Sequence, residues 1–300
     1  MKYFGKHPMI MIVIGIIGIS LSAIFVKFSQ APSAVTAAWR LTWTVILMTP
    51  MVLGSRDVRK ELMSVSRKTV LLSCASGLFL AVHFVVWFES LKHTSVASST
   101  TIVCTEVIWV ALGYCLFLKG KLSVKAICSI AVTFGGSVLI ALADSSGSGV
   151  HLYGDFLSLV AAIAVAVYTL LGRIVRQNTS TSVYTYLVYT ACTAVLVALC
   201  LIQGAGMLSF GISAVVVGLA LAVFSTILGH SIFSWCLKYF SPSFVSASKL
   251  CEPVAASAMA VFLFAEYPKP VQILGSVFIL GGVYYYSLLE RKSEAQDSVS

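Results

Sequence analysis

The chain carries little charge. Only 10% of its 300 residues are Asp, Glu, Lys or Arg, against about 25% in soluble domains. Apolar residues make up 59% of the sequence, and the mean hydropathy is +0.97. Too little polar surface remains to face water, which indicates a protein whose solvent is lipid. Alternating strands of about ten residues are also lacking, and this excludes a transmembrane barrel.

Motifs for hydrolysis and for metal binding are missing as well. The sequence contains no G-x-x-x-x-G-K-[ST] loop, so ATP-driven transport is not predicted, and HExxH and GxSxG are absent. The eight cysteines form no CxxC pair and lie within or at the ends of apolar runs. We interpret them as small buried apolar residues, and we predict no cofactor and no metal site.

The main feature of the sequence is a series of long apolar runs. Spanning a membrane takes about 20 apolar residues, and ten runs of about this length predict ten transmembrane helices. The longest polar stretch, 54–68, leaves no room for a soluble domain. The ten runs lie at roughly 8–28, 33–53, 69–89, 95–117, 122–143, 152–172, 182–203, 211–235, 242–265 and 269–289.

The Lys and Arg residues that give the net charge of +9 are unevenly distributed between the two sides of the membrane. With a cytoplasmic N-terminus, 15 of the 20 Lys and Arg residues lie on the inner side and only Lys92 and Lys269 lie on the outer side. Lys27, Arg40 and Lys249 fall within the runs or near their ends. Cytoplasmic loops are enriched in Lys and Arg. The charge therefore predicts cytoplasmic N- and C-termini, and it does not indicate a nucleic-acid partner.

The second half of the chain repeats the first at an offset of 146 residues. "LKHTS" at 91–95 aligns with "LKYFS" at 237–241, Glu106 with Glu252, and "FGGSVLI" at 134–140 with "LGGVYYY" at 280–286. Each half has five runs, and because five is odd the second half enters the membrane in the opposite direction. The predicted fold is an all-α membrane protein with ten transmembrane helices in two inverted five-helix repeats.

The repeat sets the predicted domain boundaries. The first five-helix repeat covers residues 1–146, the second covers 147–292, and residues 293–300 form a cytoplasmic tail. Inverted repeats of this kind suit alternating access, in which two similar half-bundles exchange conformations around a shared site at the membrane midplane.

The chain resembles the EamA type of the drug/metabolite transporter superfamily. The resemblance rests on "SLKHTSVASS" at 90–99, "EPVAASAMAVFLFAE" at 252–266, the Gly-Gly pairs, and "YGDFLSLVAAIAVAVYTLLGR" at 153–173. The first half departs from the family pattern, because Val107 replaces the usual proline and Gly120 the usual acid. The resemblance implies a carrier of small solutes, an exporter or exchanger, in a bacterial inner (cell) membrane, and it does not specify the solute.

Six charged residues lie in or near the apolar runs. A charge costs about 2.5–3.5 kcal/mol at a helix centre and less near an end, where long side chains reach the headgroups. Glu106 and Glu252 lie near the middles of their runs, whereas Lys27 and Glu89 lie near ends. The six are Lys27, Arg40, Glu89, Glu106, Lys249 and Glu252.

Two interpretations of Glu252 remain open. Lys249 precedes it by three residues, so the two can form a structural pair on one helix face. Alternatively, Glu106 and Glu252 line a water-filled cavity between the repeats, where they bind a cationic group or carry a proton. Pro253 removes the helix bond to the carbonyl of Lys249 and predicts a kink, which faces the cavity or serves only packing.

Aromatic and polar side chains complete the predicted cavity, as in many organic-ligand sites. His83 and Trp87 share a face at spacing i, i+4, and His230 lies with Trp235 near the end of the eighth run. The alternatives are an interfacial belt for Trp39 and Trp235, ordinary hydrogen bonding for His83, and bonds to the residue's own helix for the hydroxyls. The candidates beyond the charged residues are Trp43, His83, Trp87, Thr101, Thr105 and Tyr168.

Small residues indicate where helices meet. Gly135, Gly136, Gly281 and Gly282 form two Gly-Gly pairs in register with the repeat. Glycine allows the backbones of neighbouring membrane helices to approach closely. We therefore predict helix packing at all four positions and no role in solute binding.

The predicted function is secondary active transport of small organic metabolites, and proton coupling is a candidate mechanism for it. The six charges balance, which suits a zwitterion such as an amino acid. A lipid or lipid-linked flippase, an intramembrane enzyme and a channel remain as alternatives, although no nucleophile–base constellation indicates catalysis. The expected partners are a small-molecule substrate and the lipid bilayer, with the chain as a monomer or homodimer.

Overall fold

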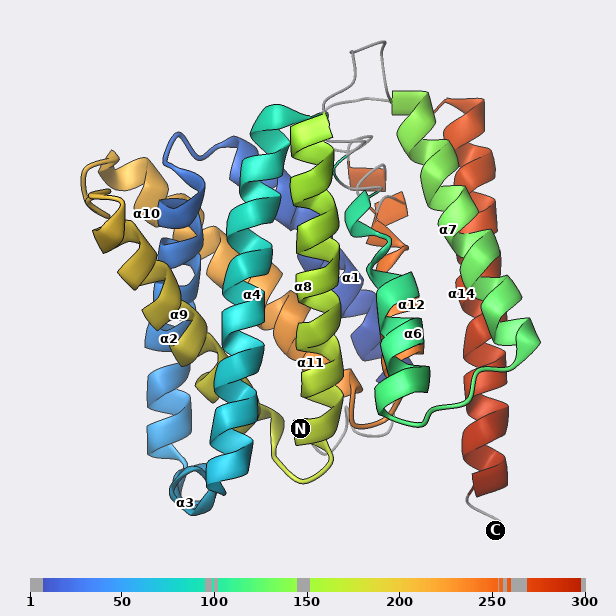
Figure 1. The fold of residues 1–300 in the computed structure, drawn as a ribbon, viewed down its shortest axis with the longest axis horizontal. Helices are drawn as coiled ribbons and strands as arrows, with labels where there is room; N and C mark the ends of the chain where they lie inside the picture. The colour runs from blue at the N-terminus through green and yellow to red at the C-terminus, as the bar shows by residue number, and fades with distance from the viewer. Residues whose placement is uncertain are drawn as a thin grey trace.

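The computed structural model describes residues 8–94, 99, 102–144, 152–252, 254–255, 258–259 and 269–297. Within these ranges the chain is helical and contains no strand (Figure 1). In chain order the elements are α1 (Pro8–Lys27), α2 (Ser33–Gly54), α3 (Arg56–Ser64), α4 (Arg67–His93), α6 (Glu106–Phe117), α7 (Val124–Asp144), α8 (Leu152–Arg176), α9 (Thr181–Ile202), α10 (Gly211–Ala220), the π-helix η2 (Leu221–His230), α11 (Ser231–Cys236), α12 (Pro242–Lys249) and α14 (Pro270–Asp297).

Several helices are long and apolar enough to cross a membrane. Among the described residues these are 8–26, 67–93, 152–176, 181–202, 211–236 (which joins α10, η2 and α11) and 270–289, with shorter apolar helices at 106–117 and 124–139. Large apolar side chains such as Leu71, Phe117, Leu201 and Ile212 are exposed. Helices satisfy their own backbone hydrogen bonds, as lipid requires. The chain is therefore a multi-pass integral membrane protein.

Serine residues begin several of these helices. The hydroxyl of Ser66 accepts a hydrogen bond from the Thr69 N–H at 3.1 Å, and that of Ser241 accepts one from the Phe244 N–H at 3.2 Å. Ser180 caps α9 in the same way. A serine cap satisfies one of the N–H groups that a helix leaves unpaired in its first turn. These caps therefore fix where α4, α9 and α12 begin.

The two halves pack around a pseudo-twofold axis. A shift of 146 residues places α1 on α8, and α4 on the segment from α10 to α11. Correspondingly, α4 packs along α8, and α1 packs along η2 and α11. The related helices α2 and α9 pack against each other, as do α7 and α14. These contacts all join one half to the other, and the shift of 146 residues exchanges the first two and maps each of the last two onto itself.

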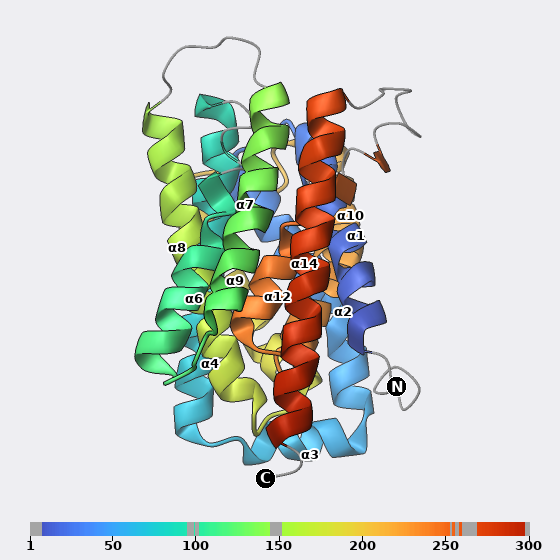
Figure 2. The same ribbon diagram turned by 90° about the vertical axis from the view of Figure 1, so that its right-hand side faces the viewer.

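The related helices also run in opposite directions. In Figures 1 and 2, α1 rises from the lower end of the bundle while α8 descends from the upper end. The first residue of α1 and the last residue of α14 both lie toward the lower end. This arrangement agrees with an inverted relation between the repeats.

The eight cysteines are free. Cys192, Cys200, Cys236 and Cys251 are buried, as the sequence predicts for small apolar residues. The prediction is wrong for the cysteines at 74, 115 and 128, which are exposed. These three lie on helices of a membrane protein, where an exposed thiol faces the same apolar surroundings as the exposed leucines.

Helices α7 and α14 meet at one glycine of each Gly-Gly pair. A Cβ atom at Gly136 would lie 2.6 Å from the carbonyl oxygen of Gly275, and one at Gly282 would lie 3.2 Å from that of Ser129. The Ser129 hydroxyl donates to the Gly282 carbonyl at 3.0 Å. The missing side chains therefore allow the two backbones to approach closely.

The prediction of helix packing is wrong for Gly135 and Gly281. A Cβ atom at either position would meet nothing within 4 Å, and both residues are exposed. The reason is helical geometry: successive residues are about 100° apart around a helix of 3.6 residues per turn, so only one glycine of each pair faces the partner helix.

This difference predicts unequal effects of the same substitution. Gly136→Ala should reduce the free energy of unfolding by about 1–3 kcal/mol relative to Gly135→Ala, because it forces a methyl group against backbone atoms. Unfolding by SDS, followed by circular dichroism of the purified protein, measures both variants. Equal stability of the two variants would contradict the close contact.

Candidate functional site

The fourth and ninth predicted runs are interrupted at equivalent positions. Residues 104–105 form a turn before α6, and residues 250–251 form a turn after α12. The offset of 146 relates these two turns. In the first, the Thr105 N–H donates to the Ile102 carbonyl at 3.0 Å; in the second, the Cys251 N–H donates to the Ser248 carbonyl at 3.1 Å. Such i→i+3 bonds tighten the backbone locally.

These turns interrupt the predicted spans 95–117 and 242–265. Each turn immediately precedes one of the paired acids, Glu106 in the first half and Glu252 in the second. Discontinuous helices at matching positions of two repeats are typical of the binding sites of transporters. The predicted kink at Pro253 and the candidate Thr101 lie outside the described residues.

A cavity of about 70 Å³ lies at the two turns. It has room for several water molecules, since one water needs about 10–15 Å³ on this scale. Both repeats contribute, and six of the predicted site residues take part. The cavity is lined by Ile19, Ser22, Arg40, His83, Trp87, Val103, Cys104, Glu106, Val165, His230, Ser246, Lys249, Leu250 and Glu252.

An ion pair joins the repeats across this cavity. The Lys249 Nζ lies 2.7 Å from Glu106 Oε1, and their side chains are 13% and 9% exposed. The hydroxyl of Thr169 donates to the same carboxylate oxygen at 3.1 Å. The interpretation of Lys249 and Glu252 as a structural pair is therefore wrong. Lys249 instead compensates the acid of the other repeat, which avoids leaving either charge buried alone.

The carboxylate of Glu252 has a different environment. It lines the cavity, and within the described part of the chain it makes no hydrogen bond or ion pair. Its backbone carbonyl accepts a hydrogen bond from the Ser20 hydroxyl at 3.3 Å, as expected where a helix is interrupted. Of the two equivalent acids, Glu106 is thus ion-paired, whereas the carboxylate of Glu252 has no such partner in the described part of the chain.

Arg40 of α2 brings a second positive charge to the cavity. Its side chain is 1% exposed, its Nε donates to the Thr226 hydroxyl at 2.8 Å, and one Nη donates to the Ser22 hydroxyl at 3.2 Å. The guanidinium carbon lies 4.2 Å from the centre of the Phe84 ring, a cation–π geometry. The π-helix η2 supplies Thr226, in keeping with the frequent occurrence of such segments at functional sites.

Aromatic rings form one wall. His83 stacks on Trp87 with ring centres 5.8 Å apart, and His230 lies edge-on to His83 at 6.5 Å and to Phe84 at 5.3 Å. The Nδ1 of His83 lies 3.0 Å from the Ala161 carbonyl. Because a carbonyl oxygen only accepts hydrogen bonds, Nδ1 carries the hydrogen. His83 therefore makes an ordinary hydrogen bond, which was one of the two alternatives given for it from the sequence.

Trp43, Thr105 and Tyr168 do not line the cavity, contrary to prediction. Their polar atoms are used elsewhere: the Trp43 indole donates to the Val215 carbonyl at 3.1 Å, the Thr105 hydroxyl donates to the Ile102 carbonyl at 2.6 Å, and the Tyr168 hydroxyl lies 2.8 Å from the Ser234 hydroxyl. Tyr168 packs behind the wall against His230.

The structure adds lining residues that the sequence analysis did not select. Ser22 comes from α1 and Ser246 from α12. Ser246 lies three residues before Lys249, and this helical spacing was a usable signal. No comparable pattern marks Ser22, which reaches the cavity only because α1 packs along η2.

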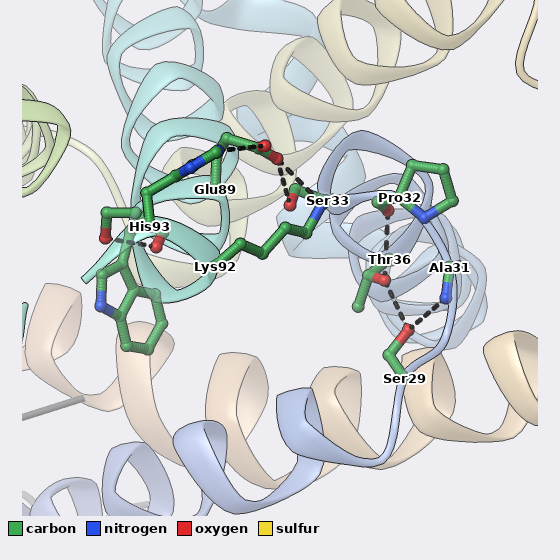
Figure 3. A network of polar contacts seen from close by, with 10 residues as sticks. Ser29, Ala31, Pro32, Ser33, Thr36, Glu89, Lys92 and His93 are labelled. Carbon is green, nitrogen blue, oxygen red and sulfur yellow. Dashed lines mark hydrogen bonds and ion pairs between the residues drawn. The ribbon is translucent and has the colours of Figure 1, made fainter. Parts of the chain in front are cut away.

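Glu89 belongs to a separate polar cluster at one end of the bundle (Figure 3). One carboxylate oxygen accepts from the Ser33 hydroxyl and from the Lys92 Nζ, both at 2.9 Å, and the other lies 3.3 Å from the His93 ring. Ser33 is the first residue of α2, where a negative charge is favourable. The cluster accounts for Glu89 without the cavity, in agreement with its position near a helix end.

Fold and site together define a class of protein. Two related halves of opposite direction, with a polar cavity at the broken helices between them, are typical of membrane transporters.

Comparison with known proteins gives the family. The EamA-like transporter family matches residues 7–142 and again 152–288. An uncharacterised transporter of Bacillus subtilis (strain 168), YxxF, is 28% identical over 232 residues, which are 77% of this chain and 73% of that protein. An uncharacterised transporter of Archaeoglobus fulgidus is 24% identical over 212 residues, 70% of this chain and 72% of the relative.

A solved crystal structure has the same fold. It covers 96% of this chain and 99% of its own, with a TM-score of 0.77 at 18% sequence identity. The chain belongs to the EamA-like transporter family, within the drug/metabolite transporter superfamily, which confirms the resemblance found in the sequence.

The ion pair between Lys249 and Glu106 predicts that removing one partner lowers the free energy of unfolding more than removing both. Lys249→Met should destabilise the protein by about 3–5 kcal/mol because it leaves Glu106 buried without a cation. Adding Glu106→Gln should recover much of this loss. The control is Lys92→Met, which removes the exposed partner of Glu89 and should cost less than about 1 kcal/mol. SDS unfolding measures all of them, and a double variant no more stable than Lys249→Met would contradict the pairing.

Proposed function

We propose that this protein is a secondary active transporter of small organic metabolites, an exporter or exchanger, that works by alternating access. One observation carries the proposal: Glu106 and Glu252 occupy equivalent helix breaks of two related halves, and both line a single cavity. Halves of similar structure can exchange conformations, and such an exchange would open the cavity to each side of the membrane in turn.

The proposed topology has ten transmembrane spans with both termini in the cytoplasm. The 15-to-2 distribution of Lys and Arg supports it, and so does the position of the ends of α1 and α14 toward one end of the bundle. The two repeats would comprise 1–146 and 147–292, with a tail at 293–300. A bacterial inner membrane is the proposed location, supported by the relative from Bacillus subtilis.

Glu252 is the proposed site of proton or cation coupling. Its carboxylate faces the cavity without a fixed partner among the described residues, whereas Glu106 is held by Lys249 and Thr169. A carrier that couples to protons needs an acid whose charge state changes during the cycle. Glu252 fits this requirement better than Glu106, because neutralising Glu106 would strand the buried charge of Lys249.

Amino acids are the leading candidates for the solute. Two basic groups, Arg40 and Lys249, and two acidic groups, Glu106 and Glu252, line the cavity, and this balance suits a zwitterion. The stacked His83 and Trp87 offer an apolar face for a side chain. One chain supplies the whole lining, so the proposed transport unit is a monomer, and a homodimer would consist of two such units.

The alternative of a lipid flippase is less well supported. A flippase needs a groove open to lipid, but Arg40, His83 and Glu106 are only 1%, 5% and 7% exposed. Transport is also favoured over an intramembrane enzyme, because the relatives are transporters.

The transport proposal predicts a specific effect of Glu252→Gln. Proteoliposomes containing the wild-type protein should take up solutes from a radiolabelled amino-acid mixture, faster when a pH gradient is imposed. Glu252→Gln should abolish the response to the gradient, because an amide, unlike a carboxyl group, does not gain or lose a charge in the physiological pH range. Glu89→Gln should retain the response.

Two results would count against this proposal. Uptake equal to that of protein-free liposomes would refute amino-acid transport. An unchanged pH response in both Glu106→Gln and Glu252→Gln would refute coupling through these acids.

The topology is tested independently by reporter fusions. Green fluorescent protein joined after Asp297 should fluoresce in Escherichia coli, because it folds in the cytoplasm, and alkaline phosphatase joined there should be inactive. Alkaline phosphatase joined after Asp144 should be active, since five spans precede that point. An active phosphatase at the C-terminus would rule out the ten-span arrangement.

A further inference from the structure

Three hydrogen-bond donors at the cavity have no acceptor within the described part of the chain. They are the second Nη of Arg40, the indole Nε1 of Trp87 and the hydroxyl of Ser246, and all three are buried. Buried polar groups in native proteins nearly always find a partner. Three such groups on a single cavity, contributed by α2, α4 and α12, indicate a shared ligand rather than three unrelated packing defects.

The guanidinium of Arg40 is held in a fixed orientation. Thr226 and Ser22 each accept one of its hydrogens, and the Phe84 ring covers one face. These contacts leave the remaining Nη buried and without an acceptor among the described residues. Arginine keeps its positive charge in proteins, and none of the described ion pairs involves Arg40. A buried cation of this kind favours an anion beside it.

The type of anion follows from the other charges. Glu106 and Glu252 line the same cavity, so a dianion such as phosphate would meet two carboxylates. A monoanionic carboxylate brings a single negative charge and two acceptor oxygens, which matches a guanidinium with one unpaired nitrogen and two neutral donors on the same cavity.

We infer that the cavity binds its solute by a carboxylate group, with Arg40 as the main anchor and Trp87 and Ser246 as additional donors. This inference rests on the proposed function and deepens it, because it assigns the solute to the organic carboxylates. A solute that also carries an amine would place that amine toward Glu252.

Formate tests the inference, because it is the smallest carboxylate and fits a cavity of this volume whatever the natural solute is. The full-length protein, purified in detergent, is titrated with sodium formate, and its unfolding temperature is followed at constant ionic strength. Wild type should show a saturable rise. Formamide, the neutral analogue, should give none.

Variants locate the site. In Arg40→Gln the apparent affinity for formate should fall by about tenfold or more, as expected for loss of a hydrogen bond to a charged group. Arg40→Lys keeps the charge but loses the fork geometry, and it should bind with intermediate affinity. The matched control is Arg176→Gln: Arg176 is also buried but donates to the Ser234 and Thr179 carbonyls away from the cavity.

The outcomes separate this inference from the transport proposal. Saturable formate binding that is lost in Arg40→Gln and kept in Arg176→Gln supports the carboxylate site, even if no amino acid is transported. Wild type without a saturable, formate-specific rise overturns it, and this result does not depend on whether a variant folds. Formate binding that is unchanged in Arg40→Gln or in Arg40→Lys also overturns it, even if amino-acid uptake is observed.

Discussion

Charges buried inside a membrane protein must be compensated by other charges, by hydrogen bonds or by water, and this constraint explains the centre of the molecule. Lys249 and Glu106 compensate each other across the boundary between the repeats, and Thr169 adds a hydrogen bond. The pair does more than neutralise two costs, because its members come from different halves. Any motion that separates the halves at this point must expose both charges to water or offer them new partners.

The two repeats are alike in backbone and unlike in charge. Both interrupt a helix immediately before a glutamate, but the residue equivalent to Lys249 in the first half is Val103. The two helix breaks themselves therefore supply one cation for two acids. Glu106 takes it, and Glu252 remains open to the cavity. This asymmetry assigns different roles to two positions that the internal repeat makes formally equivalent.

The polar groups of the bundle fall into two sets. At one end, Glu89, Ser33, Lys92 and His93 form a partly exposed cluster between α2 and α4 (Figure 3). Around the cavity, by contrast, Arg40 and Glu106 are buried and Lys249 and Glu252 are partly buried, and several donors have no partner among the described residues. The first set joins two helices, and the second lines the cavity to which we assign the proposed solute site. Membership of the EamA-like family agrees with this reading and leaves the solute to be determined by the cavity chemistry.

The sequence by itself determined the solvent, the helices and the repeat. Apolar length, Lys and Arg placement and a constant offset are local or periodic properties, so they can be read without coordinates, and they also singled out Glu106, Glu252, Lys249, Arg40, His83 and Trp87. The tertiary structure decided which side chains form ion pairs and hydrogen bonds with each other. Lys249 lies three residues from Glu252 in sequence but bonds Glu106 across 143 residues, and Trp43 and Tyr168 point their polar atoms at other helices. Such contacts depend on how helices rotate against each other, because a shift of one residue turns a side chain by about 100°. The same rotation separates Gly136 from Gly135 and brings Ser22 to the cavity, and no pattern within a single helix encodes it.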